Sequence, residues 1–268
     1  HDVNDKEGIR SNSIYSLLVD DRGAVWVGHF QAGLDYSLYQ NGLFRTYAYP
    51  PLFNSANLSI RSFVNRGQEK VIGSRDGLFY INEATGVVKS FVKPVLTSDL
   101  ILTISFYQGE YYIGTYGGGM MVLNPGTLSL KYFAQGDTEL FQKGHIFCVK
   151  PDAKGNLWIG TSQGLFCYNG QTKQIKHFTS ANSQLPEGNV YEVSFDSTGK
   201  GWIATETGMC IYDPASQSLR SNVFPEGFVH RDKVRTIYED AGHNLYFIRE
   251  KGSLFTSTLT MDRFQNRS

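Results

Sequence analysis

A motif of about 44 residues returns six times along the chain, and this period constrains the fold more than any other feature. Each copy has an apolar segment, a turn with Gly and often Asp, and a second segment rich in aromatic and β-branched residues. A marker glycine in the turn falls at residues 23, 67, 109, 155, 199 and 242, so the steps are 44, 42, 46, 44 and 43 residues. A fixed period of about 20–50 residues is typical of repeat architectures. The repeats span nearly the whole chain and therefore decide its fold class.

Four short segments separated by turn residues make up each copy. The first segment (14–19 or 190–195) has apolar residues three apart, which alone favours a helix. It lasts only six residues, however, so a strand is the better interpretation. Four strands in a unit of this length are typical of a β-propeller blade. The sequence therefore predicts an all-β fold, a β-propeller of six four-stranded blades.

The predicted boundaries follow from the repeat. We expect an N-terminal segment at residues 1–10 and a β-propeller at residues 11–268. The blades are predicted at about 11–48, 57–92, 98–134, 143–179, 187–222 and 230–266.

Several recurring residues have structural explanations. Trp26, Trp158 and Trp202, with Tyr112 in the same slot, are predicted to pack between blades, because large aromatic residues dominate such interfaces. The marker glycines are predicted to adopt left-handed turn conformations. The turn aspartates are predicted to accept hydrogen bonds from the backbone two residues on. These aspartates are Asp20, Asp152, Asp196 and Asp240.

Composition excludes other classes of protein. Lys and Arg number 25 and so do Asp and Glu, so the chain lacks the basic excess of a nucleic-acid surface. No apolar run approaches the roughly 18 residues of a membrane span. Cys148, Cys167 and Cys210 lie in apolar runs and are expected to be small buried side chains. Because the chain begins with His1, we expect either a removed leader or a piece of a longer protein.

The repeat resembles that of a known family. The pattern Asn12-x-Ile14, Asp20-x-x-Gly23-x-x-Trp26-Val27-Gly28 and Gly33-Leu34 recurs around Asp152, Trp158 and Gly164. It is similar to the two-component-regulator propeller repeat, most strongly in the first, fourth and fifth copies. That resemblance implies the periplasmic sensor region of a hybrid two-component system histidine kinase, one that controls polysaccharide-utilisation genes in Gram-negative gut bacteria.

The same resemblance implies partners and a larger assembly. A family sensor carries two propellers, an immunoglobulin-like domain, a membrane helix and kinase modules, and it works as a homodimer. Its propellers usually have seven blades, so six copies imply part of a seven-bladed or double propeller. This segment itself is expected to contact neither nucleic acid nor membrane.

Apparent catalytic motifs have simpler interpretations. Residues 160–164 match G-x-S-x-G, but a nucleophile elbow needs a strand-to-helix turn, whereas these residues form the connection between the second and third strands. The six His never stand at metal-ligand spacing with a second His or Cys. The sequence therefore predicts no catalytic residue, no metal and no cofactor.

Variable positions at one end of the blades are the candidates for binding. In a propeller, the connections into the first strand and between the second and third strands emerge on one face. The residues there differ between copies while the scaffold repeats, which indicates recognition. Mixed Arg, His, Glu, Gln and Tyr suit a polyhydroxylated or acidic sugar. The predicted ligand-binding residues are His29, Gln31, Arg75, Tyr116, His145, Gln163, Glu206 and Arg249.

Three functional hypotheses remain open. The first is a non-enzymatic sensor domain that detects a glycan or oligosaccharide and relays it to a membrane-bound histidine kinase. The second is a scaffold propeller that holds other protein domains without a small ligand. The third is a propeller enzyme similar to the streptogramin lyases, for which His29, His145 and Glu206 are the only suitable set.

Overall fold

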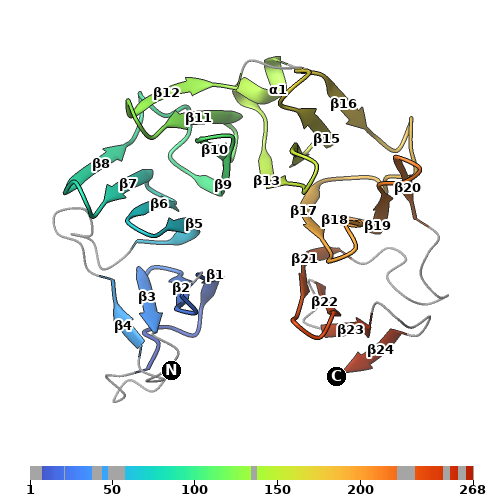
Figure 1. Ribbon diagram of the computed structural model, residues 1–268, viewed down its shortest axis with the longest axis horizontal. Coiled ribbons are helices and arrows are strands. Elements are labelled where there is room, and N and C mark those ends of the chain that lie inside the picture. The colour runs from blue at the N-terminus through green and yellow to red at the C-terminus, as the bar shows by residue number, and fades with distance from the viewer. Residues whose placement is uncertain are drawn as a thin grey trace. The chain divides into compact units, whose positions relative to one another are not determined.

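Six four-stranded sheets make up the molecule. The computed structural model describes residues 8–20, 22–37, 44–47, 58–133, 138–221, 233–249, 254–258 and 264–267. In each sheet the strands are antiparallel and follow chain order (Figure 1). The first three sheets contain β1 (Ile14–Val19), β2 (Val25–His29), β3 (Leu34–Ser37), β4 (Phe44–Thr46), β5 (Ile60–Arg66), β6 (Glu69–Ser74), β7 (Leu78–Asn82), β8 (Val87–Phe91), β9 (Ile101–Tyr107), β10 (Glu110–Thr115), β11 (Met120–Asn124) and β12 (Ser129–Tyr132). The last three contain β13 (Ile146–Pro151), β14 (Asn156–Thr161), β15 (Gly164–Asn169), β16 (Ile175–Phe178), β17 (Val190–Phe195), β18 (Gly201–Thr205), β19 (Gly208–Asp213), β20 (Ser218–Arg220), β21 (Val234–Glu239), β22 (Asn244–Arg249), β23 (Leu254–Thr258) and β24 (Phe264–Arg267).

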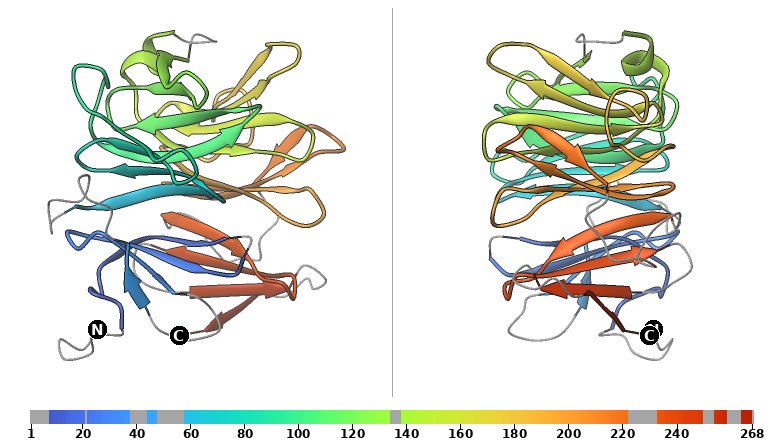
Figure 2. Two further views of the ribbon diagram at one scale, coloured as in Figure 1. Left: turned by 60° about the vertical axis from the view of Figure 1, so that its left-hand side comes forward. Right: turned by 90° about the vertical axis from the view of Figure 1, so that its right-hand side faces the viewer.

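The chain divides into two compact units of three sheets each, residues 1–133 and 134–268. Within the first unit, β5 lies against β1 and β9, and within the second unit, β17 lies against β13 and β21. In each sheet the strands run side by side as a twisted layer (Figure 2). The predicted all-β propeller of six four-stranded blades is thus confirmed.

One short helix was not predicted. Helix α1 (Thr138–Lys143) precedes the fourth sheet and buries Leu140 and Phe141. The Phe141 ring meets that of Phe166 in an edge-to-face contact with centroids 5.3 Å apart. Six residues are too few to show a helical period, so the pattern of the sequence carries no signal for it.

The turn between the first and second strands uses its Asp and Gly as expected, with one correction. Gly23 and Gly155 both have φ of +78°, and the carboxylate of Asp152 accepts the backbone N–H of Lys154 at 2.9 Å. In the sixth sheet the left-handed residue is His243, with φ of +61°, rather than Gly242. His243 stands three residues after its turn Asp, as Gly23 does. The spacing from Asp therefore sets the turn, and choosing Gly242 as the marker placed it one residue early.

Each of the three tryptophans is buried, as predicted, and each also bonds its turn aspartate. Trp158 is 1% exposed, and its Nε1–H donates to Asp152 Oδ2 at 2.9 Å. The same bond joins Trp202 to Asp196 at 2.8 Å. We call this arrangement the Asp–Trp clasp. It ties one end of the turn to the core of the sheet, and it recurs between Trp26 and Asp20.

In the sixth sheet a tyrosine replaces the tryptophan of the clasp. Tyr246 Oη donates to Asp240 Oδ2 at 2.8 Å, and Asn244 donates to the same carboxylate through its side chain and its backbone. The side-chain bond from Asn244 and then its backbone bond lower the pKa of Asp240 from 3.8 to about 2, against the opposing effect of burial.

This shift predicts a loss of stability in acid. A carboxyl group whose pKa falls on folding stabilises the protein above its unfolded pKa, and that contribution disappears as pH falls towards the folded pKa. We therefore expect the free energy of unfolding to decrease between pH 4 and pH 2, since the pKa of Asp240 falls from 3.8 to about 2. Urea denaturation of the wild type and Asp240→Asn across this range measures it. The variant should show the shallower pH dependence, and identical slopes would contradict the assignment.

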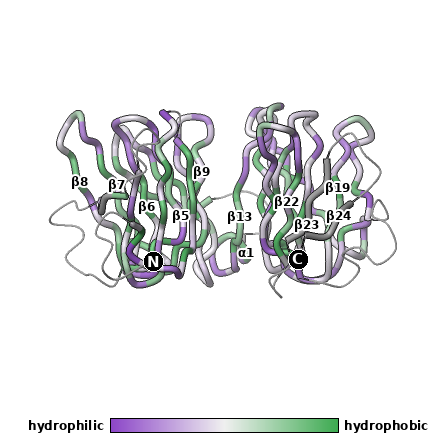
Figure 3. Tube along the Cα trace, turned by 90° about the horizontal axis from the view of Figure 1, so that it is seen from below, coloured by the Kyte–Doolittle hydropathy of each residue, from purple (hydrophilic) through white to green (hydrophobic). Residues whose placement is uncertain are grey.

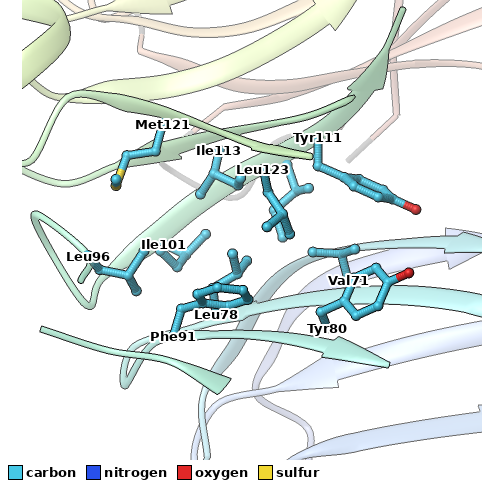
Figure 4. Packing of buried hydrophobic residues seen from close by; sticks show 11 residues of the cluster. Val71, Leu78, Tyr80, Phe91, Leu96, Ile101, Tyr111, Ile113, Met121 and Leu123 are labelled. Carbon is cyan, nitrogen blue, oxygen red and sulfur yellow. The ribbon is translucent and has the colours of Figure 1, made fainter. Parts of the chain in front are cut away.

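Neighbouring sheets of the first unit pack through apolar side chains. Green, hydrophobic stretches lie along many of the strands, and purple, hydrophilic stretches are frequent at the sheet ends (Figure 3). One large cluster lies between the second and third sheets, and its labelled members point towards one another (Figure 4). These are Val71, Leu78, Tyr80, Phe91, Leu96, Ile101, Tyr111, Ile113, Met121 and Leu123.

A glycine near the end of the second strand lets the next sheet approach. A Cβ on Gly160 would lie 2.7 Å from the carbonyl oxygen of Val190, the first residue of β17. A Cβ on Gly28 would lie 2.9 Å from the carbonyl oxygen of Ile60, the first residue of β5. Both distances are below van der Waals contact, so a side chain at either position would push the neighbouring first strand away. These glycines therefore allow the first strand of the next sheet to approach closely.

Candidate functional site

In five of the sheets, the turn between the second and third strands lies beside the residue that precedes the first strand. A backbone N–H of the turn donates to the carbonyl of that residue. The donor and acceptor residues are Phe30 and Ser13 (2.8 Å), Arg75 and Ser59 (3.1 Å), Tyr116 and Leu100 (3.0 Å), Ser162 and His145 (3.2 Å), and Glu206 and Asn189 (2.9 Å). The two connections that sequence analysis selected for binding thus lie at the same end of the strands in each of these sheets.

The side chain of His29 lies inside the protein. It is 0% exposed, and its Nε2 lies 2.9 Å from Asp35 Oδ2. Arg10 Nε donates to the other oxygen of Asp35 at 2.8 Å. The corresponding residue of the fourth sheet, Thr161, instead donates its hydroxyl to Gly164 O at 2.8 Å across the turn. His29 therefore belongs to the interior of the first sheet and not to the set of surface residues.

The other predicted residues of the first unit are exposed at the turns. The backbone N–H groups of Gln31 and Arg75 donate to the hydroxyl and the carbonyl of Ser59, at 3.2 and 3.1 Å. Gln31 and Arg75 therefore meet at Ser59. Tyr116 stands on the next sheet with 51% of its surface exposed, and its carbonyl accepts the Ser98 hydroxyl at 2.8 Å.

In the second unit, the predicted residues Glu206 and Gln163 contact neighbouring segments of the chain. Glu206 Oε2 accepts the backbone N–H of Asn189 at 3.4 Å, so the Glu206 turn and the start of β17 are joined twice. Gln163 is exposed, and its carbonyl lies 2.8 Å from His177 Nε2. Arg249 pairs with Val234 at the end of β22, but its side chain lies outside the described residues.

A β-bulge near the start of the first strand recurs in all six sheets and was not predicted. In β13, Ile146 and Cys148 pair with consecutive residues of β14, which leaves Phe147 as the extra residue. Bulges re-aim a side chain and are frequent next to functional sites. The six bulge residues are Tyr15, Arg61, Leu102, Phe147, Tyr191 and Arg235. The residue just before each of them is Ile or Val and is fully buried in five of the six sheets, whereas the bulge side chains differ from sheet to sheet.

Three bulge residues of the second unit form the centre of an aromatic and cationic group. We call this group the Tyr191 cluster, and it consists of His145, Phe147, Asn189, Tyr191, Glu206, Lys233 and Arg235. The rings of Phe147 and Tyr191 meet edge to face with centroids 5.1 Å apart, and the His145 ring lies 6.2 Å from that of Phe147. The cluster thus presents a row of rings across two neighbouring first strands.

Polar groups surround the Tyr191 ring. Its hydroxyl accepts the Asn189 side-chain N–H at 3.1 Å. The Arg235 guanidinium lies 4.4 Å from the ring centroid and the Lys233 ammonium 5.1 Å from it. Cations at such distances are attracted to the negative face of the ring. The arrangement combines an aromatic surface with positively charged hydrogen-bond donors, and such groups together can bind a ligand.

Sequence reasoning found His145 and Glu206 but missed Phe147, Tyr191 and Arg235. A signal for the missed residues was present, because each directly follows a repeated buried residue and itself does not repeat. Residues at the turns were selected because they differ between copies. The same criterion, applied to the start of the first strand, would have selected these positions too.

The described cysteines and the G-x-S-x-G string lie in structural surroundings. Burial raises the pKa of the Cys148 thiol to about 12 and does the same for Cys167, so neither is a ready nucleophile. The G-x-S-x-G string forms the turn between β14 and β15, as expected. Among the described residues, no three His, Cys, Asp or Glu side chains gather as metal ligands would.

Comparisons with known proteins agree with the repeat. The model of the two component regulator propeller family matches residues 8–31 and 141–163. These matches lie at the first and fourth repeats. None of the curated proteins matches the chain.

Solved structures with similar folds include extracellular domains of signalling systems. The extracellular domain of the putative hybrid two component system BT3049 from B. thetaiotaomicron has a TM-score of 0.77 and 23% identity, covering 94% of this chain and 34% of that chain. The corresponding domain of BT4673 from the same organism has a TM-score of 0.64 and 16% identity, covering 93% and 38%. YCF48 bound to D1 peptide has a TM-score of 0.68 and 12% identity, covering 95% and 80%. The present chain thus spans just over a third of the length of the two-component structures.

None of the helices in the described residues has the length and apolar character needed to cross a membrane. The fold, the two sequence matches and the neighbouring structures agree with one another. The chain is a β-propeller in which two repeats match the two component regulator propeller family.

Proposed function

We propose that this chain is the periplasmic sensor part of a hybrid two-component system, and that it binds an oligosaccharide at the Tyr191 cluster. In the proposed role the chain is not an enzyme, and the binding event passes to a membrane-bound histidine kinase. The companion propeller, the immunoglobulin-like domain and the homodimer of such a receptor belong to the same proposal.

The family and the neighbouring structures support a sensor-type propeller. Two repeats match a family described as a two component regulator propeller. The neighbours BT3049 and BT4673 are extracellular domains of putative hybrid two component systems. A position outside the cytoplasm and a signalling role in this chain are in keeping with both observations.

The main support for an oligosaccharide ligand is the pair of rings at Phe147 and Tyr191, which has polar groups around it. The apolar face of a sugar ring packs on an aromatic surface, while its hydroxyl groups need placed donors and acceptors. Asn189 and Arg235 offer donors beside Tyr191, and the Glu206 turn offers a carboxylate next to Asn189. This mixture fits a polyhydroxylated ligand better than a purely apolar one.

Calorimetric titration of the purified chain with a panel of oligosaccharides tests this proposal. We expect one member of the panel to bind, and Tyr191→Ala to weaken its binding at least tenfold, which corresponds to about 1.4 kcal/mol. The matched control is Tyr238→Ala, because Tyr238 lies on β21 of the same unit with 62% of its surface exposed and is not part of the cluster. The control should bind like the wild type. Equal binding by the wild type and Tyr191→Ala would remove the cluster as the site.

Signal relay is tested in the parent receptor. The same oligosaccharide should change the autophosphorylation of the wild-type receptor but not that of the Tyr191→Ala receptor. A response that persists in the variant would show that the cluster does not transmit the signal.

A further inference from the structure

The first unit contains its own aromatic and cationic group at the bulges of β1 and β5. The Arg61 guanidinium lies 4.6 Å from the centroid of the Tyr15 ring, and Tyr15 meets Phe30 edge to face at 5.4 Å. Tyr15 and Arg61 are the bulge residues of adjacent first strands. The same placement occurs in the second unit, where Arg235 lies over Tyr191 at 4.4 Å. Two separate parts of the chain therefore set an arginine over a tyrosine in the same way.

The backbone under Arg61 is firmly placed. Ile60 is fully buried, and its carbonyl lies close to Gly28 and to the hydroxyl of Ser16, which donates to it at 3.4 Å. Ser59, which precedes Ile60, holds the turns of Gln31 and Arg75. The guanidinium thus stands on a fixed strand beside two exposed turns that sequence analysis had selected for binding.

The charge of Arg61 has no counter-ion among the described residues. Its side chain is half-buried, yet it forms neither a hydrogen bond nor an ion pair there, and its Nε is buried without an acceptor. Buried polar groups normally have a partner, and a partly desolvated cation normally has an anion beside it. Arg66, at the other end of β5, illustrates the usual arrangement: it lies over the Phe106 ring and pairs with the Glu69 carboxylate at 3.4 Å.

We propose that Arg61 and Tyr15 form a binding site for a carboxylate attached to a sugar ring, that is, a uronic acid. The solvent-facing N–H groups of the guanidinium match the two oxygens of a carboxylate. Tyr15, 45% exposed, and Phe30 supply the apolar surface on which the ring rests. Arg75 on the neighbouring turn adds a second positive charge to the surroundings. This site is distinct in residues from the Tyr191 cluster and does not depend on the function proposed for it.

Nuclear magnetic resonance of the arginine side chains tests the site, with sodium glucuronate as the probe and glucose as its neutral counterpart. The Arg61 Nε–H resonance, assigned by its loss in Arg61→Lys, should shift saturably with millimolar glucuronate and stay in place with glucose. Sodium sulfate distinguishes a general anion site from a carboxylate site. A sulfate shift equal to that of glucuronate would overturn the carboxylate assignment, and so would an equal response to glucose or no saturable shift.

Two variants separate binding from packing. Arg61→Gln should weaken glucuronate binding at least tenfold, whereas Arg66→Gln, which removes an arginine from the same strand, should leave it unchanged. Arg61→Lys keeps the charge and checks that the fold is retained if Arg61→Gln unfolds. It should bind several times more weakly than the wild type because it lacks the planar fork. Unchanged binding in Arg61→Gln would show that the residue only packs on Tyr15.

The Tyr191→Ala chain distinguishes this site from the proposed function. It should keep full glucuronate binding at Arg61, because none of its altered atoms belongs to the first unit. Loss of glucuronate binding in Tyr191→Ala would assign the probe to the Tyr191 cluster and overturn the site at Arg61.

Discussion

Replacing Trp158 by alanine is expected to lower the free energy of unfolding by about 3–5 kcal/mol, the range for removing a large buried aromatic side chain. Trp158 is 1% exposed, and its ring centroid lies 4.4 Å from that of Tyr212 in the next sheet. It also stacks on Phe178 of its own sheet, with an interplanar angle of 11°. The substitution would therefore leave a cavity and remove contacts both within one sheet and between two sheets.

Urea denaturation followed by far-ultraviolet circular dichroism measures this loss. Trp158→Phe is the matched variant, because it keeps most of the ring but removes the N–H that bonds Asp152. We expect it to cost about 1–2 kcal/mol, mainly for the carboxylate oxygen that loses one of its donors. Asn156 still donates to that oxygen at 2.8 Å, which limits the loss. A cost below about 1 kcal/mol for Trp158→Ala would contradict the packing described for this residue.

Replacing Asp196 by alanine is expected to lower the free energy of unfolding by about 2–4 kcal/mol, since several buried donors lose their acceptor together. Asp196 is 6% exposed. Its carboxylate accepts Trp202 Nε1–H at 2.8 Å and the backbone N–H groups of Thr198 and Lys200 at 2.9 and 3.0 Å. Water reaches this side chain poorly, so it cannot replace all of these bonds.

The control for Asp196→Ala is another aspartate in a turn that lacks a clasp. Asp213 accepts the backbone N–H of Ala215 at 2.9 Å but bonds no tryptophan. Asp213→Ala should therefore destabilise the protein much less than Asp196→Ala in the same denaturation experiment. Similar losses for the two variants would mean that the turn alone, and not the clasp, accounts for the effect of Asp196.

The repeat was sufficient to predict the blades because its period gives the length of each blade and its turn residues mark where a strand ends. An apolar segment of six residues that ends in an Asp-x-x-Gly turn leaves room for a strand and not for a helix of useful length. The Asp–Trp clasp was not predicted, because the period places the two residues in one hairpin but does not give the direction of the second carboxylate oxygen. The left-handed position of the sixth turn was misplaced because it was assigned to a glycine, Gly242, and not by its spacing from Asp240. His243 occupies that position.

The candidate site could be predicted only in part because of the bulges. The order of the strands determines which connections lie at the same end of a sheet. This order correctly placed Gln31, Arg75, His145 and Glu206 at that end. A bulge adds one residue to a strand and changes which side each following side chain takes. The sequence contains no marker for this extra residue, so the directions of Phe147 and Tyr191 required the structure. His29 illustrates the opposite case, since a partner such as Asp35 draws a polar side chain inwards.

The bulges have a consequence for how chains with this fold diversify. Each of the six sheets has one extra residue near the start of its first strand, and its side chain changes from Tyr15 through Leu102 to Arg235. Under the two binding proposals, new specificities would arise by substitution at these six positions. An engineer who wished to redirect the protein to another compound would begin by randomising those six codons.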